Sequence, residues 1–271
     1  MKPLPTLFLS HGSPMHAISP GEVGDAWKAL GQRLPRPDAV LIASAHWETA
    51  VPMVTGSARP ETIHDFGGFP QALYEIQYAA RGNPDLATQV VRLLKEAGIT
   101  AGVDGCRGLD HGAWVPLRWM YPDAAIPVIE LSVSPARGPA HHLALGRALQ
   151  PLRDTGVLII GSGHATHNLR DWIVNRGHEE PLRYAVDFAH WLEQRLNAHD
   201  DDALIHYRDE APNAVRAHPT EEHYLPLLVA YGAAGSASPV ERVVDGYENG
   251  ALSRDSFLFG PTGRDSRCAG D

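Results

Sequence analysis

The sequence predicts a single α/β domain in which a central, mostly parallel or mixed sheet is flanked by helices. Short apolar runs typical of buried strands alternate along the chain with segments of helical periodicity. Three of the apolar runs, within residues 6–11, 39–46 and 157–167, end in small residues that histidine follows. Because ligands bind at the carboxyl ends of strands in such folds, we expect the active site at these strand ends.

In the first half of the chain, a helix over residues 25–34 separates strands over 6–10 and 39–46. Pro35-Arg36-Pro37 ends this helix, because proline restricts both itself and the residue before it. Asn83, Pro84 and Gly98 are typical of the start and end of a helix. We therefore expect a helix over 84–97. A strand over 51–55 is expected before it. After it we expect a glycine-bracketed loop over 108–114 that leads into 115–121, then a strand over 127–133 and a helix over 139–152.

In the second half, a strand begins at residue 157 and an amphipathic helix covers residues 182–196. Residues 200–217 are polar, and His199 and His206 are expected to face solvent. Pro226 would clash inside a continuous helix, so we expect a turn near residues 222–223. The remaining expected elements are a helix over 226–232, strands over 239–244 and 252–259, and a polar, mobile tail over 262–271.

Composition excludes several classes of function. The 271 residues carry a formal net charge of −9 and contain no run rich in lysine or arginine, which argues against nucleic acid and anionic membranes as partners. No window approaches the roughly 18 consecutive apolar residues of a spanning helix. The two cysteines, Cys106 and Cys268, lie far apart and form no disulfide pattern, and no signal peptide is recognisable. These features predict a cytoplasmic protein whose domain covers residues 1–261.

Histidine is the unusual residue, with 15 copies against 23 lysines and arginines together. Neutral imidazole is a common ligand of zinc and also suits iron. His11 and His46 each follow a strand, so they are candidate metal ligands, although a lone histidine is more often a hydrogen-bonded loop residue. A catalytic metal commonly has three protein ligands. Spacing alone leaves the third open among His64, His111, His164, His167, His218 and His223.

Six short motifs occur in a fixed order along the chain. They cover residues 10–15, 44–47, 63–70, 109–114, 161–169 and 219–227. Together they resemble the DOPA-dioxygenase-type family of class III (LigB-like) extradiol ring-cleavage dioxygenases. The resemblance extends from residue 7 to about residue 259, which is nearly the whole chain.

The resemblance implies a role for most of the histidines in these motifs. It implies metal ligation by His11, His46 and His223, acid–base catalysis by His167, a place in the substrate and oxygen pocket for His111, and substrate contact or support of the site for His64 and Asp65. His164 is expected beside the site without an assigned role. In the wider superfamily the third ligand is a glutamate, which leaves Glu221 or Glu222 as an alternative to His223.

By this resemblance, residues 1–261 are an extradiol dioxygenase-like catalytic domain that uses Fe(II) and O2. The substrate is expected to be a small aromatic diol, with DOPA as one candidate, and the product a ring-opened semialdehyde. Three histidines also suit Zn(II), which can occupy such a site in purified protein. A zinc hydrolase using the same histidines, and a non-enzymatic binding module on the same fold, remain as alternatives.

Overall fold

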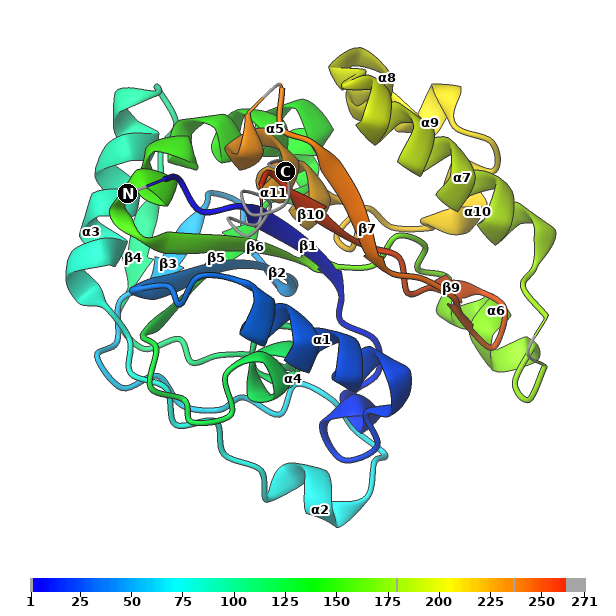
Figure 1. Ribbon diagram of the computed structural model, residues 1–271, viewed down its shortest axis with the longest axis horizontal. Coiled ribbons are helices and arrows are strands. Elements are labelled where there is room, and N and C mark those ends of the chain that lie inside the picture. Colours follow the sequence, from blue (N-terminus) through cyan, green and yellow to red (C-terminus); the bar gives the residue numbers. More distant parts are fainter. Residues whose placement is uncertain (1, 179, 236, 262–271) are drawn as a thin grey trace, which may run out of the picture.

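The computed structural model describes residues 2–178, 180–235 and 237–261, so the predicted tail over 262–271 lies outside the described residues. An eight-stranded sheet, in the order β4-β3-β5-β2-β6-β1-β10-β7, runs through the molecule (Figure 1). Its strands are β1 Thr6–Ser10, β2 Ala39–Glu48, β3 Met53–Thr55, β4 Gly102–Asp104, β5 Val128–Val133, β6 Val157–Gly163, β7 Val240–Val244 and β10 Ser256–Phe259. The short strands β8 Tyr247–Glu248 and β9 Leu252–Ser253 form a separate ribbon.

The four central strands are parallel and the outer ones mix both directions. Strand β2 pairs parallel with β5 and β6, and β6 pairs parallel with β1. Strands β10 and β7 continue the sheet antiparallel, and β3 pairs antiparallel with β5. The predicted mixed sheet is therefore confirmed, and the carboxyl ends of β1, β2 and β6 meet at one edge.

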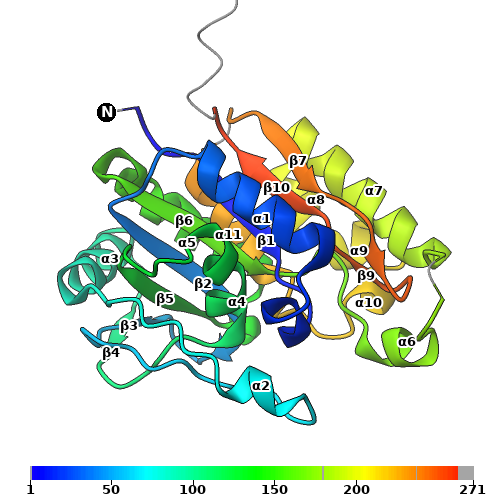
Figure 2. The same cartoon turned by 60° about the horizontal axis from the view of Figure 1, so that its bottom comes forward.

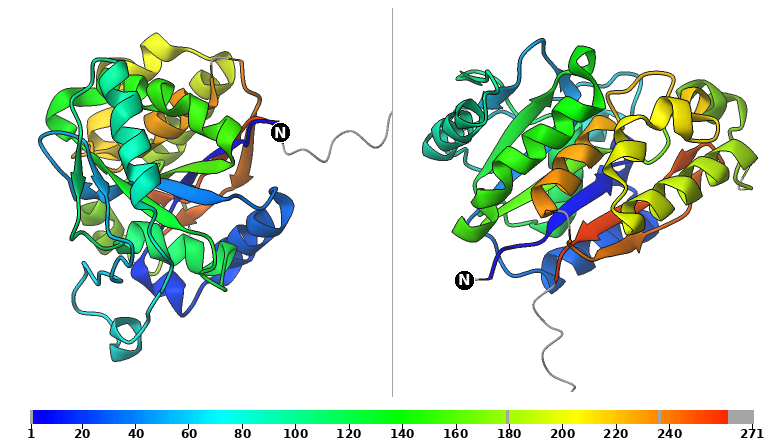
Figure 3. Two further views of the ribbon diagram at one scale, coloured as in Figure 1. Left: turned by 90° about the vertical axis from the view of Figure 1, so that its left-hand side faces the viewer. Right: turned by 90° about the horizontal axis from the view of Figure 1, so that it is seen from above.

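Helices cover both faces of the sheet (Figures 2 and 3). Strand β2 alternates accordingly: Val40 and Ile42 pack on the side of α1 and α4, while Leu41 and Ala43 pack on the side of α3, α5 and α11. The helices are α1 Gly21–Arg33, α2 Gln71–Tyr74, α3 Pro84–Glu96, α4 His111–Met120, α5 Gly138–Leu149, α6 Leu169–Val174, α7 Arg183–Ala198, α8 Asp201–Ile205, α9 Tyr207–Glu210, α10 Ala214–Ala217 and α11 Leu225–Ala234.

Two expectations about local structure were wrong, and one polar stretch holds helices that were not predicted. In that stretch, residues 200–217 form the short helices α8, α9 and α10, because Leu204 and Tyr207 are buried in a cluster with α7, while His206 is exposed as expected. Residues 252–259 do not form one strand: Ser10 Oγ donates to Asp255 O at 2.7 Å, between β9 and β10. His111 lies in no loop but is the first residue of α4, whose first turn is closed by the Asp110 carbonyl. Among the helices of the described residues, none has the length and apolar character needed to cross a bilayer.

Candidate metal centre and pocket

Two histidines reach the carboxyl edge of the sheet from neighbouring strands. His11 directly follows β1, as the sequence predicts. His46 does not end its strand, because β2 continues to Glu48. The pairing of β2 with β5 instead shifts between Ser44 and Glu48, and this irregularity releases His46 from the ladder.

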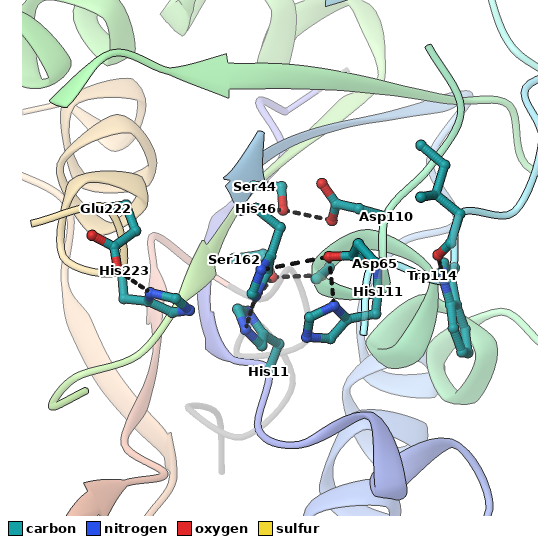
Figure 4. A network of polar contacts seen from close by, with 12 residues as sticks. His11, Ser44, His46, Asp65, Asp110, His111, Trp114, Ser162, Glu222 and His223 are labelled. Carbon is teal, nitrogen blue, oxygen red and sulfur yellow. Dashed lines mark hydrogen bonds and ion pairs between the residues drawn. The ribbon is translucent and has the colours of Figure 1, made fainter. Parts of the chain in front are cut away.

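The ligand nitrogens of His11, His46 and His223 lie within 4.8 Å of one another. The Nε2 atoms of His11 and His46 are 3.0 Å apart, and Figure 4 shows both rings beside that of His223. The Nε2 of His223 is buried and has no hydrogen-bond partner among the described residues. A buried polar atom without a partner is costly. A metal ion at this point would satisfy it, so these residues fit a metal.

A chain of hydrogen bonds fixes the orientation of His11. Pro116 lies inside α4 and has no N–H, so it cannot bond to the carbonyl of Gly112 one turn earlier. Ser162 Oγ donates to that carbonyl at 2.5 Å and lies 2.9 Å from Nδ1 of His11. Since the single hydroxyl proton is used, Ser162 accepts from Nδ1–H of His11. The Nε2 lone pair of His11 is therefore free for a metal.

The other two rings have carboxylates on their Nδ1 side. Glu222 Oε1 lies 3.0 Å from Nδ1 of His223, and Asp65 Oδ2 lies 3.5 Å from Nδ1 of His46 (Figure 4). Partners of this kind set the tautomer of ligating histidines and raise their basicity. Glu222 thus contacts the outer side of His223. Glu221 turns away, bonding to Tyr207 at 3.1 Å and Arg208 at 2.9 Å, so neither glutamate joins the three-histidine cluster.

Burial keeps the three histidines neutral. Burial, and then the neighbouring histidines, lower the pKa of His11 and His223 well below the usual value. The same two causes lower the pKa of His46 to about 4, against the opposing effect of Asp110 and Asp65. Neutral imidazole is the form that binds metals. The centre can therefore bind a metal at neutral pH without first losing protons.

Asp65 holds His111 at the edge of the centre. Its Oδ1 accepts from the backbone N–H of His111 at 2.9 Å, and its Oδ2 accepts from Nδ1 at 2.8 Å. Burial opposes ionisation of Asp65, but these hydrogen bonds and the adjacent histidine charges lower its pKa to about 2. Asp65 is therefore a carboxylate at neutral pH, and it leaves Nε2 of His111 free.

His167 stacks on His223, with ring centroids 3.4 Å apart and an interplanar angle of 12°. Its backbone N–H donates to Ala217 O at 2.8 Å, and its ring lines the cavity described below. Burial and neighbouring histidines lower the pKa of His167 well below its usual value. The ring is thus neutral and able to accept a proton.

Two predicted site histidines are held by backbone atoms. His164 accepts from Gly12 N–H at 3.0 Å through Nε2 and faces Ser253 O at 3.2 Å through Nδ1, so both nitrogens are engaged. His164 lines the cavity and holds the loop that follows β1. His64 donates to Ile76 O at 3.0 Å and packs beside Trp114, outside the cavity lining.

A cavity of about 250 Å³ opens beside the histidines. Typical small-molecule sites are about 300–1,000 Å³, so this volume suits a single aromatic ring with a short side chain. The lining residues are His11, Gly12, Ser13, Pro14, His46, Phe66, Phe69, His111, His164, His167, Leu169, Trp172, His223, Glu248 and Leu252. Phe66, Phe69 and Leu169 lie in the sequence motifs. Trp172 and Glu248 were missed, and no pattern in the sequence indicates them.

The α/β fold brings His11, His46 and His223 together at its strand ends beside a small cavity, an arrangement that can hold a metal ion and a small ligand. The chain belongs to the LigB family, described as the catalytic LigB subunit of aromatic ring-opening dioxygenase, which matches residues 5–259. This confirms the predicted resemblance and makes the chain an extradiol-type oxidoreductase.

Individual relatives agree with the family. The chain is 41% identical over 260 residues to a 4,5-DOPA dioxygenase extradiol of Escherichia coli (strain K12), covering 95% of each protein. It is 42% identical over 264 residues to the protein of the same name from Beta vulgaris, covering 95% of this chain and 97% of that protein. The crystal structure of an uncharacterized protein from Escherichia coli K12 superposes on this structure with a TM-score of 0.82. The two chains are 36% identical, and the match covers 95% of this chain and 100% of that chain.

Proposed function

We propose that residues 1–261 form a non-haem Fe(II)-dependent extradiol dioxygenase that opens a small, single-ring catechol with O2 to a semialdehyde. The observation that carries this proposal is the buried Nε2 of His223, which has no partner, in a residue whose ligand nitrogen lies within 4.8 Å of those of His11 and His46. These three residues hold the metal. Fe(II) held by them would supply open coordination positions for a catechol and O2 and would favour ionisation of a diol hydroxyl.

His167 is the base that takes the second diol proton. It is neutral and buried, it lines the cavity, and it stacks on a ligand ring. A base close to the reacting hydroxyl contributes about 10²- to 10⁴-fold in rate. The imidazolium that results can return its proton to the product later in the reaction.

His111 stabilises negative charge that develops on oxygen. Its ring is fixed by the bond of Nδ1 to Asp65, which leaves Nε2 as the atom that would donate to that charge. Donors fixed in advance beside developing charge are effective in a buried site. Phe66, Phe69 and Trp172 provide the aromatic wall against which the substrate ring packs.

Relatives named 4,5-DOPA dioxygenase extradiol support a catechol of the DOPA type as the substrate. Three neutral histidines also suit Zn(II), so zinc found in purified protein would not by itself indicate zinc chemistry. A zinc hydrolase using this centre would act without O2, which separates it from the dioxygenase.

The test begins with metal-free protein reconstituted anaerobically with Fe(II) or Zn(II) and then exposed to air with a panel of catechols. We expect O2 uptake coupled to semialdehyde absorbance with Fe(II) alone. His11→Ala should abolish both signals, whereas His190→Ala, on the exposed side of α7, should keep them. Ester or amide hydrolysis by the Zn(II) form, with no O2 uptake by the Fe(II) form, would overturn the proposal.

The role of His167 needs a separate readout. His167→Ala is expected to bind iron and lose turnover, with iron content measured on the same sample. Full turnover at full iron occupancy would show that another group is the base.

A further inference from the structure

Glu248, in the short strand β8, is the one carboxylate that lines the cavity within the described part of the chain. Its Oε1 lies 2.6 Å from Nε2 of His16. No hydrogen bond to its Oε2 is found among the described residues, and Oε2 is not one of the fully buried polar atoms that lack a partner. One oxygen of the carboxylate is therefore engaged, while the other can accept a hydrogen bond from a ligand.

Gly12 places this carboxylate close to the metal centre. Gly12 follows His11 and has φ +68, which favours glycine. A Cβ at this position would lie 2.5 Å from Nε2 of His16 and 3.0 Å from Glu248 Oε1. The carboxylate thus packs against the backbone of the residue next to a ligand, and consecutive Cα atoms are only about 3.8 Å apart. A ring bound at the metal would bring a short side arm near Glu248.

Glu248 brings a negative charge to the cavity wall. Burial opposes ionisation of Glu248, but the hydrogen bond and charge of His16 lower its pKa below the usual value, so it is anionic at neutral pH. No lysine or arginine lines the cavity in the described ranges. Arg254 lines a separate hollow and lies 3.7 Å from Glu22 Oε2, and its charge also contributes to the lowered pKa of Glu248.

We propose that Glu248 determines specificity by binding an ammonium group on a short arm of the catechol. The preferred substrates are then catechols with an amine, including catecholic amino acids, over catecholic acids. A carboxylate can only accept hydrogen bonds, and an ammonium supplies donors together with the opposite charge. A substrate carboxylate in the same place would meet like charge. This inference rests on the proposed dioxygenase function.

The test compares kcat/KM of the iron-loaded enzyme for three catechols of similar size. Dopamine carries a cation, 4-methylcatechol is neutral, and 3,4-dihydroxyphenylacetate is an anion. The wild-type enzyme should prefer them in that order. In Glu248→Gln the ratio of kcat/KM for dopamine to that for 4-methylcatechol should fall about tenfold or more, the usual scale for losing a hydrogen bond to a charged group.

Two further variants separate recognition from a purely structural role. Glu241→Gln removes a carboxylate that pairs with Arg33 on the surface, at 2.7 Å, and should leave the ratio unchanged. His16→Gln removes the internal pair but keeps the carboxylate, so the preference for dopamine should persist. If His16→Gln lowers the ratio as much as Glu248→Gln, the pair sets the specificity and the inference is wrong.

The wild-type enzyme also provides a test that does not depend on any variant folding. Equal efficiency with dopamine and 3,4-dihydroxyphenylacetate would overturn the assignment of Glu248 and leave the dioxygenase intact. No ring cleavage of any catechol at full iron occupancy would instead overturn the proposed function itself.

Discussion

Ser162→Ala is expected to weaken metal binding about 10- to 100-fold, the usual effect of losing a partner behind a metal ligand. The reason is the tautomer of His11. Ser162 is fully buried and lies 2.9 Å from Nδ1 of a histidine that is 2% exposed, so water does not replace the hydroxyl. Without that acceptor, the tautomer of His11 that carries its proton on Nε2 becomes more favourable. Nε2 is the atom that the metal needs.

The size of the effect follows from the groups left unpaired. The variant leaves Nδ1–H of His11 without an acceptor, or else places the proton on the nitrogen that the metal needs. The Gly112 carbonyl that it also frees is unpaired with or without metal, so it lowers stability and not metal affinity. An unsatisfied buried polar group costs about 1–3 kcal/mol, and a tenfold change in affinity corresponds to about 1.4 kcal/mol. A cost of this size therefore corresponds to a metal affinity lower by about one to two orders of magnitude.

The assay is competition for Zn(II) between metal-free protein and a chelating dye, which requires no turnover. Ser134→Ala is the matched control, because Ser134 is 1% exposed and its Oγ has no partner among the described residues. Its affinity should equal that of the wild type. Unchanged affinity in Ser162→Ala, or an equal loss in Ser134→Ala, would refute the reasoning.

Three further predictions concern the same region. In Gly163→Ala the new Cβ would collide with the carbonyl oxygen of His223, so metal affinity and unfolding free energy should both fall, the latter by about 1–3 kcal/mol. In Asp65→Asn, iron-loaded turnover should fall about 100-fold because the amide cannot accept both N–H groups of His111. The metal-free protein should lose stability as the pH falls below about 6.5: burial holds the pKa of His46 at about 4, so the unfolded state binds more protons over this range. Each such histidine contributes about 1.4 kcal/mol per pH unit.

Each of these three predictions has its own control or contrary outcome. Gly105→Ala, where a Cβ would meet nothing within 4 Å, should match the wild type in urea unfolding and dye competition. If Gly163→Ala also matched the wild type in both measurements, the close contact between residue 163 and the carbonyl of His223 would be contradicted. Asp65→Asn with full iron occupancy and wild-type turnover would remove Asp65 from the mechanism. An unfolding free energy that stays constant between pH 6.5 and 4.5 would show that the buried histidines are not neutral.

The sequence was sufficient for the α/β class and for the helix over 84–97, observed as α3 Pro84–Glu96. Periodicity and capping residues are local properties, so they can be read without knowing the fold. The position of His11 directly after β1 followed for the same reason, whereas the predicted strand end at His46 was wrong because β2 continues to Glu48. The helix that follows His223 was also predicted near its observed start, because Pro226 fits the first turn of α11.

The pairing of strands and the convergence of distant side chains could not be predicted from local patterns in the sequence. The irregularity that releases His46 depends on how β2 pairs with β5, and burial of Tyr207 depends on α7 packing over it. The sequence by itself determined which histidines were candidates. Only the tertiary structure decided that Ser162, 151 residues from His11, fixes its tautomer, and that Glu248, 232 residues from His16, closes the cavity wall. Contacts over such separations are set by the packing of strands and helices, which no local pattern contains.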